Sequence, residues 1–236
     1  MKKVHIRRFP TRPELDAALV ARLDEAISAA AAAGGAAIML SGGHTPLPAY
    51  RELATRLKLS GAALRGTLHV LFSDDRYVPA DSELSNYHAS RPLLDALALP
   101  EEQVLRVRTE LPLEEAALDY ERRLRALLDR GVTVTLGMLG LGADGHTASL
   151  FRSADLARAH GRLALAVSRP DGLSGVSVTP QFLAHIPEPL FVVAGTGKEA
   201  AIAGLERGDP GVVAVQAVAG CAGIGIWVEQ AAERGA

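Results

Sequence analysis

Short apolar stretches alternate along this chain with longer amphipathic ones. The first amphipathic stretch predicts a helix from Pro13 to about Ala33, because apolar residues recur there at four-residue steps. Gly34-Gly35 is expected to end it. The apolar stretch AAIMLS at 36–41 follows directly and is typical of a strand that is buried on both faces. The pattern at this end of the chain therefore predicts a helix followed by a strand.

The same alternation continues to the C-terminus. Further strands are predicted at 67–74, 103–106, 134–141, 163–168, 176–180, 189–195 and 223–229. Further helices are predicted at 46–59, 85–97, 113–130 and 199–207, with Pro46 as a first helical residue and Ser85-Asn86 as a helix start. Strands that alternate with helices predict an α/β fold with a mostly parallel, Rossmann-like sheet flanked by helices on both faces. No linker or repeat divides the chain, so we expect a single domain over 1–236.

Polar and glycine-rich turns follow several of the predicted strands. Gly42-Gly43, Arg76 and His146 each come after a different strand, and Lys198 follows a fourth. The carboxyl ends of parallel strands lie at one edge of a sheet, so we expect these groups in one crevice. Backbone N–H groups, an arginine and a lysine suit a phosphate group.

Each of these turns also has a plainer interpretation. Ser41-Gly42-Gly43 alone is more often a tight turn, Asp74-Asp75-Arg76 is more often a solvated ion pair, and a lone lysine is usually on the surface. The segment Leu136–Phe151 reads as a strand, a glycine-broken turn and a helix start. From spacing alone, His146 either meets a polar substrate or merely caps or packs.

Composition narrows the classes of function. The chain has 236 residues, 48% of them hydrophobic, a formal net charge of −2 and a pI near 6.4, with no basic field for nucleic acid. A single cysteine, Cys221, permits no internal disulfide, and neither a signal peptide nor a membrane span is recognisable. We therefore expect a cytoplasmic protein without nucleic-acid or membrane partners. No self-complementary patch is identifiable, so a monomer is the default.

Several common motifs are absent from the sequence. The first glycine turn reads SGGHTP rather than G-x-G-x-x-G, no G-K-[ST] occurs, and 172–175 closes one residue too early for a G-x-S-x-G elbow. The seven histidines include no zinc-binding pair at i and i+4 with a glutamate between them. We therefore expect no metal, no cofactor and no serine-hydrolase mechanism.

Several separated segments are similar to one family. In order along the chain they are SGGHTP (41–46), SDDRYVP (73–79), SNYHASRPLL (85–94), LGLGADGHTASLF (139–151), SVTPQFL (177–183) and VVAGTGKEAAI (192–202). The chain resembles the 6-phosphogluconolactonases, within the superfamily that includes glucosamine-6-phosphate deaminase. The segment from Asp144 to Phe151 is the most specific, since the deaminases differ after the histidine.

The resemblance implies hydrolysis of 6-phospho-D-glucono-1,5-lactone to 6-phosphogluconate in the pentose phosphate pathway, without a metal. It implies that His146 is the general base that activates water and that Asp144 orients it. The substrate-binding residues implied are Gly42, Gly43, His44, Thr45, Asp74, Arg76, Gly145 and Lys198. Histidine side chains in water have a pKa of about 6.5, which suits proton abstraction from water near neutral pH. As water attacks, N–H groups at 142–146 or a nearby cation could stabilise the charge on the carbonyl oxygen.

The chain departs from the family pattern at three places. Asp75 stands where the family usually has glutamate, Gly175 where it usually has arginine, and Arg152-Ser153 where it usually has Pro-Gly. If the usual arginine assists with the phosphate, Arg169 or another group must take over that role. Two alternatives to the lactonase stay open at this point: a deaminase or isomerase of an amino-sugar phosphate, and a non-catalytic sugar-phosphate sensor.

Overall fold

The computed structural model describes residues 3–33, 35–60 and 68–233. Two predicted features, the helix end at Gly34 and the strand start at Thr67, lie outside the described residues. The central feature of the fold is a seven-stranded sheet in which every pair of neighbouring strands is parallel. Its strands, in spatial order, are β1 (Lys3–Phe9), β10 (Gly223–Glu229), β9 (Leu190–Val193), β6 (Thr133–Leu139), β2 (Ala36–Leu40), β3 (Leu68–Phe72) and β5 (Val104–Leu105). The predicted α/β fold is confirmed.

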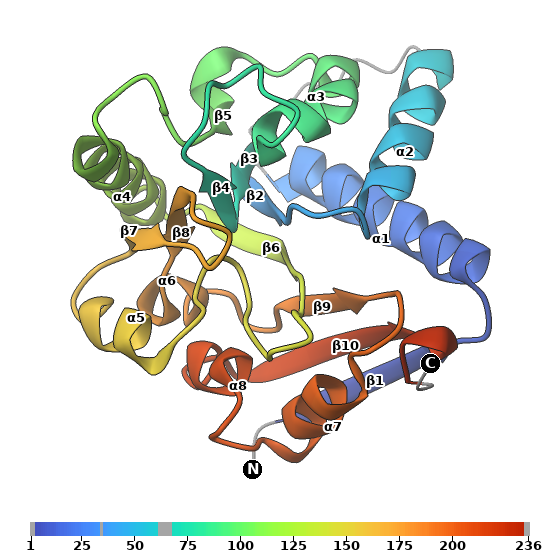
Figure 1. Ribbon diagram of the computed structural model, residues 1–236. Helices are drawn as coiled ribbons and strands as arrows, with labels where there is room; N and C mark the ends of the chain where they lie inside the picture. The colour runs from blue at the N-terminus through green and yellow to red at the C-terminus, as the bar shows by residue number, and fades with distance from the viewer. Residues whose placement is uncertain (1–2, 34, 61–67, 234–236) are drawn as a thin grey trace.

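Helices cover both faces of this sheet (Figure 1). They are α1 (Arg12–Ala33), α2 (Leu47–Ser60), α3 (Asn86–Leu97), α4 (Leu113–Asp129), α5 (Ser153–Arg158), α6 (Pro180–Leu183), α7 (Glu199–Arg207) and α8 (Val213–Ala217). Two 3₁₀ turns lie at Glu101–Gln103 and Gln230–Glu233. None of the helices described is long and apolar enough to cross a membrane.

Strand β2 shows why the sheet is covered on both sides. Its side chains alternate: Ile38 and Leu40 pack in the core beneath α1, α2 and α3, while Ala37 and Met39 pack in the core on the opposite face. All five residues of the strand are buried. Because successive side chains of a strand point to opposite faces, a continuous apolar run is what a strand between two helical layers requires.

A second sheet of three antiparallel strands lies on one side of the first. It consists of β4 (Asp74–Arg76), β8 (Ser174–Val178) and β7 (Ala164–Ser168), in that order. The segments 163–168 and 176–180 are strands as predicted, within a few residues, but they lie in this antiparallel sheet and not in the parallel one. The polar turn expected after Asp74 was also wrong, because Asp74–Arg76 pairs with the backbone of β8. Three polar residues carry no periodic pattern, so only the tertiary pairing makes them a strand.

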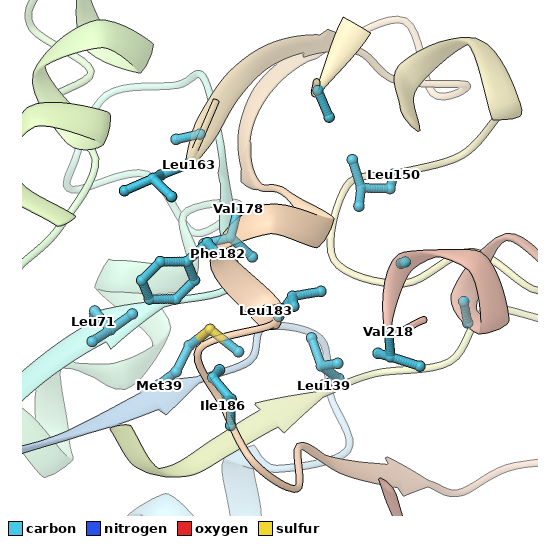
Figure 2. Close-up of a cluster of buried hydrophobic side chains, with 14 of the residues drawn as sticks. Met39, Leu71, Leu139, Leu150, Leu163, Val178, Phe182, Leu183, Ile186 and Val218 are labelled. Carbon is cyan, nitrogen blue, oxygen red and sulfur yellow. The ribbon is translucent and has the colours of Figure 1, made fainter. Parts of the chain in front are cut away.

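Apolar side chains fill the space between the two sheets. Figure 2 shows Met39 and Leu139 of the parallel sheet, with Ile186, below Phe182, and Val178 of β8 above Phe182. All five belong to one buried cluster. This shared core supports our proposal that 1–236 is one domain, and it fixes the position of the small sheet relative to the large one.

Most predicted elements are found within a few residues of their expected ends. Helix α3 begins as expected, and its N-cap Ser85 accepts a hydrogen bond from the backbone N–H of His88 at 3.2 Å. Helix α2 starts one residue later than expected, because the Pro46 carbonyl accepts its first helical hydrogen bond. The pattern missed β1 and α8, and it expected a helix immediately after His146, whereas the next helix, α5, begins only at Ser153.

The order of the strands places a crevice at one edge of the sheet. The chain proceeds from β2 outward to β3 and β5, and then returns to place β6 on the other side of β2. The loops that leave β2 and β6 therefore diverge above their carboxyl ends. Crevices at such points of reversal are where open α/β sheets bind ligands.

Candidate active site

A cavity of about 380 Å³ occupies this crevice. Its walls come from the loops after β2, β3, β6 and β9 and from the small sheet. The lining residues are Ser41, Gly42, Gly43, His44, Thr45, Pro46, Ser73, Asp74, Arg76, Asn86, Gly140, Leu141, Gly142, His146, Ala148, Arg169, Val192, Ala194 and Lys198.

Eight of the ten candidate residues line this one cavity. They are Gly42, Gly43, His44, Thr45, Asp74, Arg76, His146 and Lys198. Asp144 does not reach the wall and instead contacts His146 from outside. Gly145 is buried against Val212, and its carbonyl accepts a hydrogen bond from Ala214 of α8 at 2.9 Å. Gly145 therefore does not line the cavity, because it packs against Val212 and α8.

His146 and Asp144 form a pair through their side chains. The Nδ1 atom of His146 lies 2.5 Å from Oδ1 of Asp144, and the backbone N–H of His146 donates to the same oxygen at 3.2 Å. A carboxylate can only accept, so Nδ1 carries the proton, and in the neutral ring Nε2 keeps its lone pair. Partial burial raises the pKa of Asp144, but the two hydrogen bonds from His146 outweigh it, so this pKa lies below its ordinary value.

The loop at 142–146 is closed by its own hydrogen bonds. The N–H of Gly142 donates to the carbonyl of His146 at 2.9 Å, and the N–H of Gly145 donates to Gly142 at 3.0 Å. A Cβ at Gly142 would lie 2.1 Å from Nδ1 of His146, so only glycine lets the ring fold back over the loop. The N–H groups of Gly142, Gly145 and His146 are therefore not free to stabilise the charge on a carbonyl oxygen, which was one of the expectations from the sequence.

The loop after β2 has the free donors instead. Within the described residues, none of the backbone N–H groups at 42–45 donates a hydrogen bond. Helix α2 begins two residues later, at Leu47, with its first N–H groups also directed toward its N-terminal end. Exposed N–H groups next to a helix N-terminus favour a bound anion.

Asn86 connects this loop to the small sheet. Its Oδ1 accepts a hydrogen bond from Arg76, and its Nδ2 donates to the carbonyl of Asp74 at 2.9 Å. A Cβ at Gly42 would lie 2.0 Å from Oδ1 of Asn86, so Gly42 is small because the Asn86 side chain packs on it. Sequence reasoning identified Asn86 only as a helix start and missed its place in the wall.

Asp74 and Asp75 have different roles although they are adjacent. Asp74 lines the cavity and accepts hydrogen bonds from Ser73 at 2.8 Å and Ser149 at 2.7 Å. Asp75 points to the start of α3, where its carboxylate accepts from the backbone N–H groups of Asn86 at 2.7 Å and Tyr87 at 3.2 Å. Burial raises the pKa of Asp75 to about 6, although these hydrogen bonds act in the opposite direction.

Lys198 and Arg76 bring positive charge to opposite parts of the fold's crevice. Lys198 follows β9, and burial lowers the pKa of its ammonium group. Among the described residues no ion pair involves Lys198 or Arg76. Nor, in that part of the chain, do three or more His, Cys, Asp or Glu side chains gather in a way that could hold a metal ion.

Comparison with known proteins assigns the chain to a family. A family model described as glucosamine-6-phosphate isomerases/6-phosphogluconolactonase matches residues 10–224. The chain belongs to this family. It is 34% identical to the human 6-phosphogluconolactonase over 202 residues, which cover 82% of this chain and 78% of the relative. It is 41% identical to the 6-phosphogluconolactonase of Thermotoga maritima over 115 residues, or 48% of this chain and 49% of that relative.

Solved structures of the family share the fold. The crystal structure of a 6-phosphogluconolactonase from Thermotoga maritima superposes with a TM-score of 0.82 at 26% identity, covering 96% of this chain and all of that one. A monomeric glucosamine-6-phosphate deaminase superposes with a TM-score of 0.79 at 14% identity, covering 96% of this chain and 97% of that one. At that identity the deaminase shows the shared fold alone.

Proposed function

We propose that this protein hydrolyses 6-phospho-D-glucono-1,5-lactone to 6-phosphogluconate, a step of the oxidative pentose phosphate pathway. The observation that carries the proposal is the His146–Asp144 pair at a cavity that also contains Arg76 and Lys198. The family and the relatives named 6-phosphogluconolactonase support it. A lactone hydrolase needs a base for water and an anchor for the phosphate, and this cavity has groups for both.

The phosphate is held, in this proposal, by the free N–H groups at 42–45 together with Arg76 and Lys198. Phosphate carries a charge of about −1.5 to −2 near neutral pH, so donors and cations together favour it over neutral groups. Asp74 and Asn86 present oxygen and nitrogen atoms to the same cavity and suit the hydroxyl groups of the sugar ring. Anchoring the phosphate positions the distant lactone carbonyl relative to His146.

His146 acts as the general base. Its Nε2 takes a proton from a water molecule while the water oxygen attacks the lactone carbonyl carbon. Asp144 holds the ring by Nδ1 and stabilises the imidazolium that forms. When the tetrahedral intermediate collapses, the bond between the carbonyl carbon and the ring oxygen breaks, and the imidazolium returns its proton to that oxygen. The product is the open-chain acid, which ionises to 6-phosphogluconate.

No covalent intermediate is needed. The lactone is an activated ester that hydrolyses in water unaided, so a positioned base, worth roughly 10² to 10⁴ in rate, is sufficient together with the held phosphate. Negative charge also develops on the carbonyl oxygen as water attacks. The N–H groups of Gly142, Gly145 and His146 are already bonded and are not assigned to stabilise it.

A steady-state assay tests the proposal. Purified protein is mixed with freshly generated lactone, and loss of lactone is followed against a control without protein. We expect acceleration well above the spontaneous rate. Equal rates with and without protein would overturn the proposal. If 6-phosphogluconate then still raised the melting temperature, a sugar-phosphate sensor would replace it, and ammonia release from glucosamine 6-phosphate would indicate a deaminase.

We also propose that the protein acts in the cytoplasm as a monomer, without nucleic-acid partners, metal or cofactor. The sequence supports this through its near-neutral charge and its single cysteine. Size-exclusion chromatography with light scattering tests the oligomeric state, and a mass of twice 24.8 kDa would contradict it.

A further inference from the structure

Arg169 is a cavity residue to which the proposed reaction has so far given no role. It follows β7 directly and lies in the turn that connects β7 to β8. Its side chain lines the cavity, yet only 10% of it is exposed. A guanidinium that is buried to this degree retains its charge and requires compensating partners, so its position in the wall is specified by the structure around it.

Three contacts hold the guanidinium in place. Nε and Nη2 donate to the carboxylate of Asp171 at 3.1 and 2.9 Å, and Nη1 donates to Oγ of Ser149 at 2.7 Å. The group also lies over the ring of Phe151, 5.2 Å from its centroid. A guanidinium has five N–H groups, so one on Nη1 and one on Nη2 have no hydrogen-bond partner within the described chain. Two donors on one rigid plane are therefore available to a ligand.

Gly175 packs beside this side chain. It lies on β8, directly between Val167 of β7 and Arg76 of β4 in the ladder. A Cβ at Gly175 would lie only 2.9 Å from the carbonyl oxygen of Asp75, so the close approach of that backbone is what requires a glycine here. The same Cβ would lie 3.4 Å from Cδ of Arg169, which is an ordinary contact. The small sheet places Arg76 on one side of Gly175 and Arg169 on the other.

Arg169 adds to the positive charge of the cavity wall. The lining contains three cations, Arg76, Arg169 and Lys198, and one carboxylate, Asp74, which lies 3.9 Å from Nη1 of Arg169. Asp171 also pairs with Arg169, so three positive charges stand against two negative ones. The remaining excess of one positive charge favours a phosphate, whose charge is about −1.5 to −2 near neutral pH.

We propose that Arg169 is a third cationic ligand of the phosphate group. The inference rests on the proposed function for the identity of the ligand as a sugar-phosphate lactone. Arg169 then contributes to the preference for phosphorylated over unphosphorylated lactones. Bidentate donation from a planar guanidinium is what distinguishes it from the point charge of Lys198.

Arg169→Gln and Arg169→Lys test the assignment, with Arg56→Gln as the matched control on an exposed arginine of α2. Calorimetry measures the Kd of each variant for 6-phosphogluconate and for gluconate, and kinetics gives kcat and KM for the lactone. We expect Arg169→Gln to raise Kd for 6-phosphogluconate and KM roughly 10- to 100-fold, with kcat within about threefold. The Kd and KM of Arg169→Lys should lie between those of Arg169→Gln and those of the wild type. The Kd for gluconate should change little in both variants.

Different results would separate the two proposals. If the wild-type protein binds 6-phosphogluconate but does not hydrolyse the lactone, the proposed function is wrong. The Kd comparison then still tests the role of Arg169. Turnover by the wild type together with Kd values within twofold in Arg169→Gln overturns the role of Arg169 alone. Equal losses of affinity for gluconate and 6-phosphogluconate would also overturn it, since a purely structural change does not discriminate between them. If Arg169→Gln lowers the melting temperature sharply, the same Kd comparison is made with Arg169→Lys, which keeps the charge and the aliphatic stem. A Kd for 6-phosphogluconate within twofold of the wild type in that variant would then overturn the role of Arg169.

Discussion

The two sheets contribute to the site in different ways. The base and its acid partner, His146 and Asp144, come from one loop of the large parallel sheet and are only two residues apart in sequence. The small antiparallel sheet carries Arg76 on one strand and Arg169 just after another. The reacting pair is therefore built locally, whereas the charges that receive the substrate are assembled from distant segments. Catalysis and recognition should respond separately to mutation.

His146→Gln should have the largest effect, because it removes the base while keeping a polar side chain. We expect kcat to fall roughly 10²- to 10⁴-fold, with little change in Kd for 6-phosphogluconate. Steady-state kinetics and calorimetry measure the two quantities, and His160→Gln, on an exposed histidine after α5, is the control. A normal kcat in His146→Gln would show that His146 is not the general base. The loop of the parallel sheet would then supply no reacting group.

Arg76→Gln should have the next largest effect, and this effect should be on KM and not on kcat. The loss of one charged donor to the phosphate is expected to raise KM about 10- to 100-fold and to change kcat much less. Its bond to Asn86 is lost as well, so the melting temperature is measured beside the kinetics. A decrease in kcat without a rise in KM would contradict the role of Arg76 as a phosphate ligand.

Asp144→Asn should reduce kcat about tenfold. The carboxylate orients the ring and stabilises its charged form, but its side chain is 57% exposed, so water replaces part of its effect. Kinetics at saturating lactone measures the loss. A loss as large as that of His146→Gln would mean that Asp144 takes part in proton transfer itself.

Asp75 should affect stability and leave the chemistry unchanged. Its pKa is about 6 in the folded protein and 3.8 in its ordinary state, so the folded protein binds the proton more tightly. The free energy of unfolding should therefore fall as pH rises from about 4 to about 6, by at most about 3 kcal/mol. Denaturant titrations of the wild type and of Asp75→Asn measure the difference.

The change with pH of the free energy of unfolding is what tests the role of Asp75. Asp75→Asn should lose the fall between about pH 4 and 6, whereas Asp81→Asn, on an exposed aspartate, should keep it. Identical pH dependence in all three proteins would mean that Asp75 does not titrate in this range. Below about pH 4, where Asp75 is protonated, Asp75→Asn is also expected to be less stable than the wild type, because an amide nitrogen cannot accept from the N–H of Tyr87.

Much of the parallel sheet could be predicted from the sequence. Its strands are apolar runs, and a run such as Ala36–Leu40 can be satisfied only between two apolar layers. The small sheet could not be predicted correctly, since Asp74–Arg76 is a strand only because β8 supplies hydrogen-bond partners. Strand β1 was also missed, because five of its seven residues are exposed and no buried face marks it.

The sequence by itself determined the residue types of the site and the edge at which they meet. Glycines, His146, Arg76 and Lys198 follow strands, and in a parallel sheet the ends of those strands lie together. The resemblance to the 6-phosphogluconolactonases then indicated which reaction these residues perform.

The tertiary structure decided which donors are free and which cations reach the cavity. The N–H groups at 142–146 looked equivalent in sequence to those at 42–45, but those of Gly142, Gly145 and His146 are bonded within their own loop. Arg169 reaches the wall from the turn between β7 and β8, which packs beside β4 only in the folded small sheet. Hydrogen-bond satisfaction and steric room depend on residues that are distant along the chain, so no local pattern encodes them.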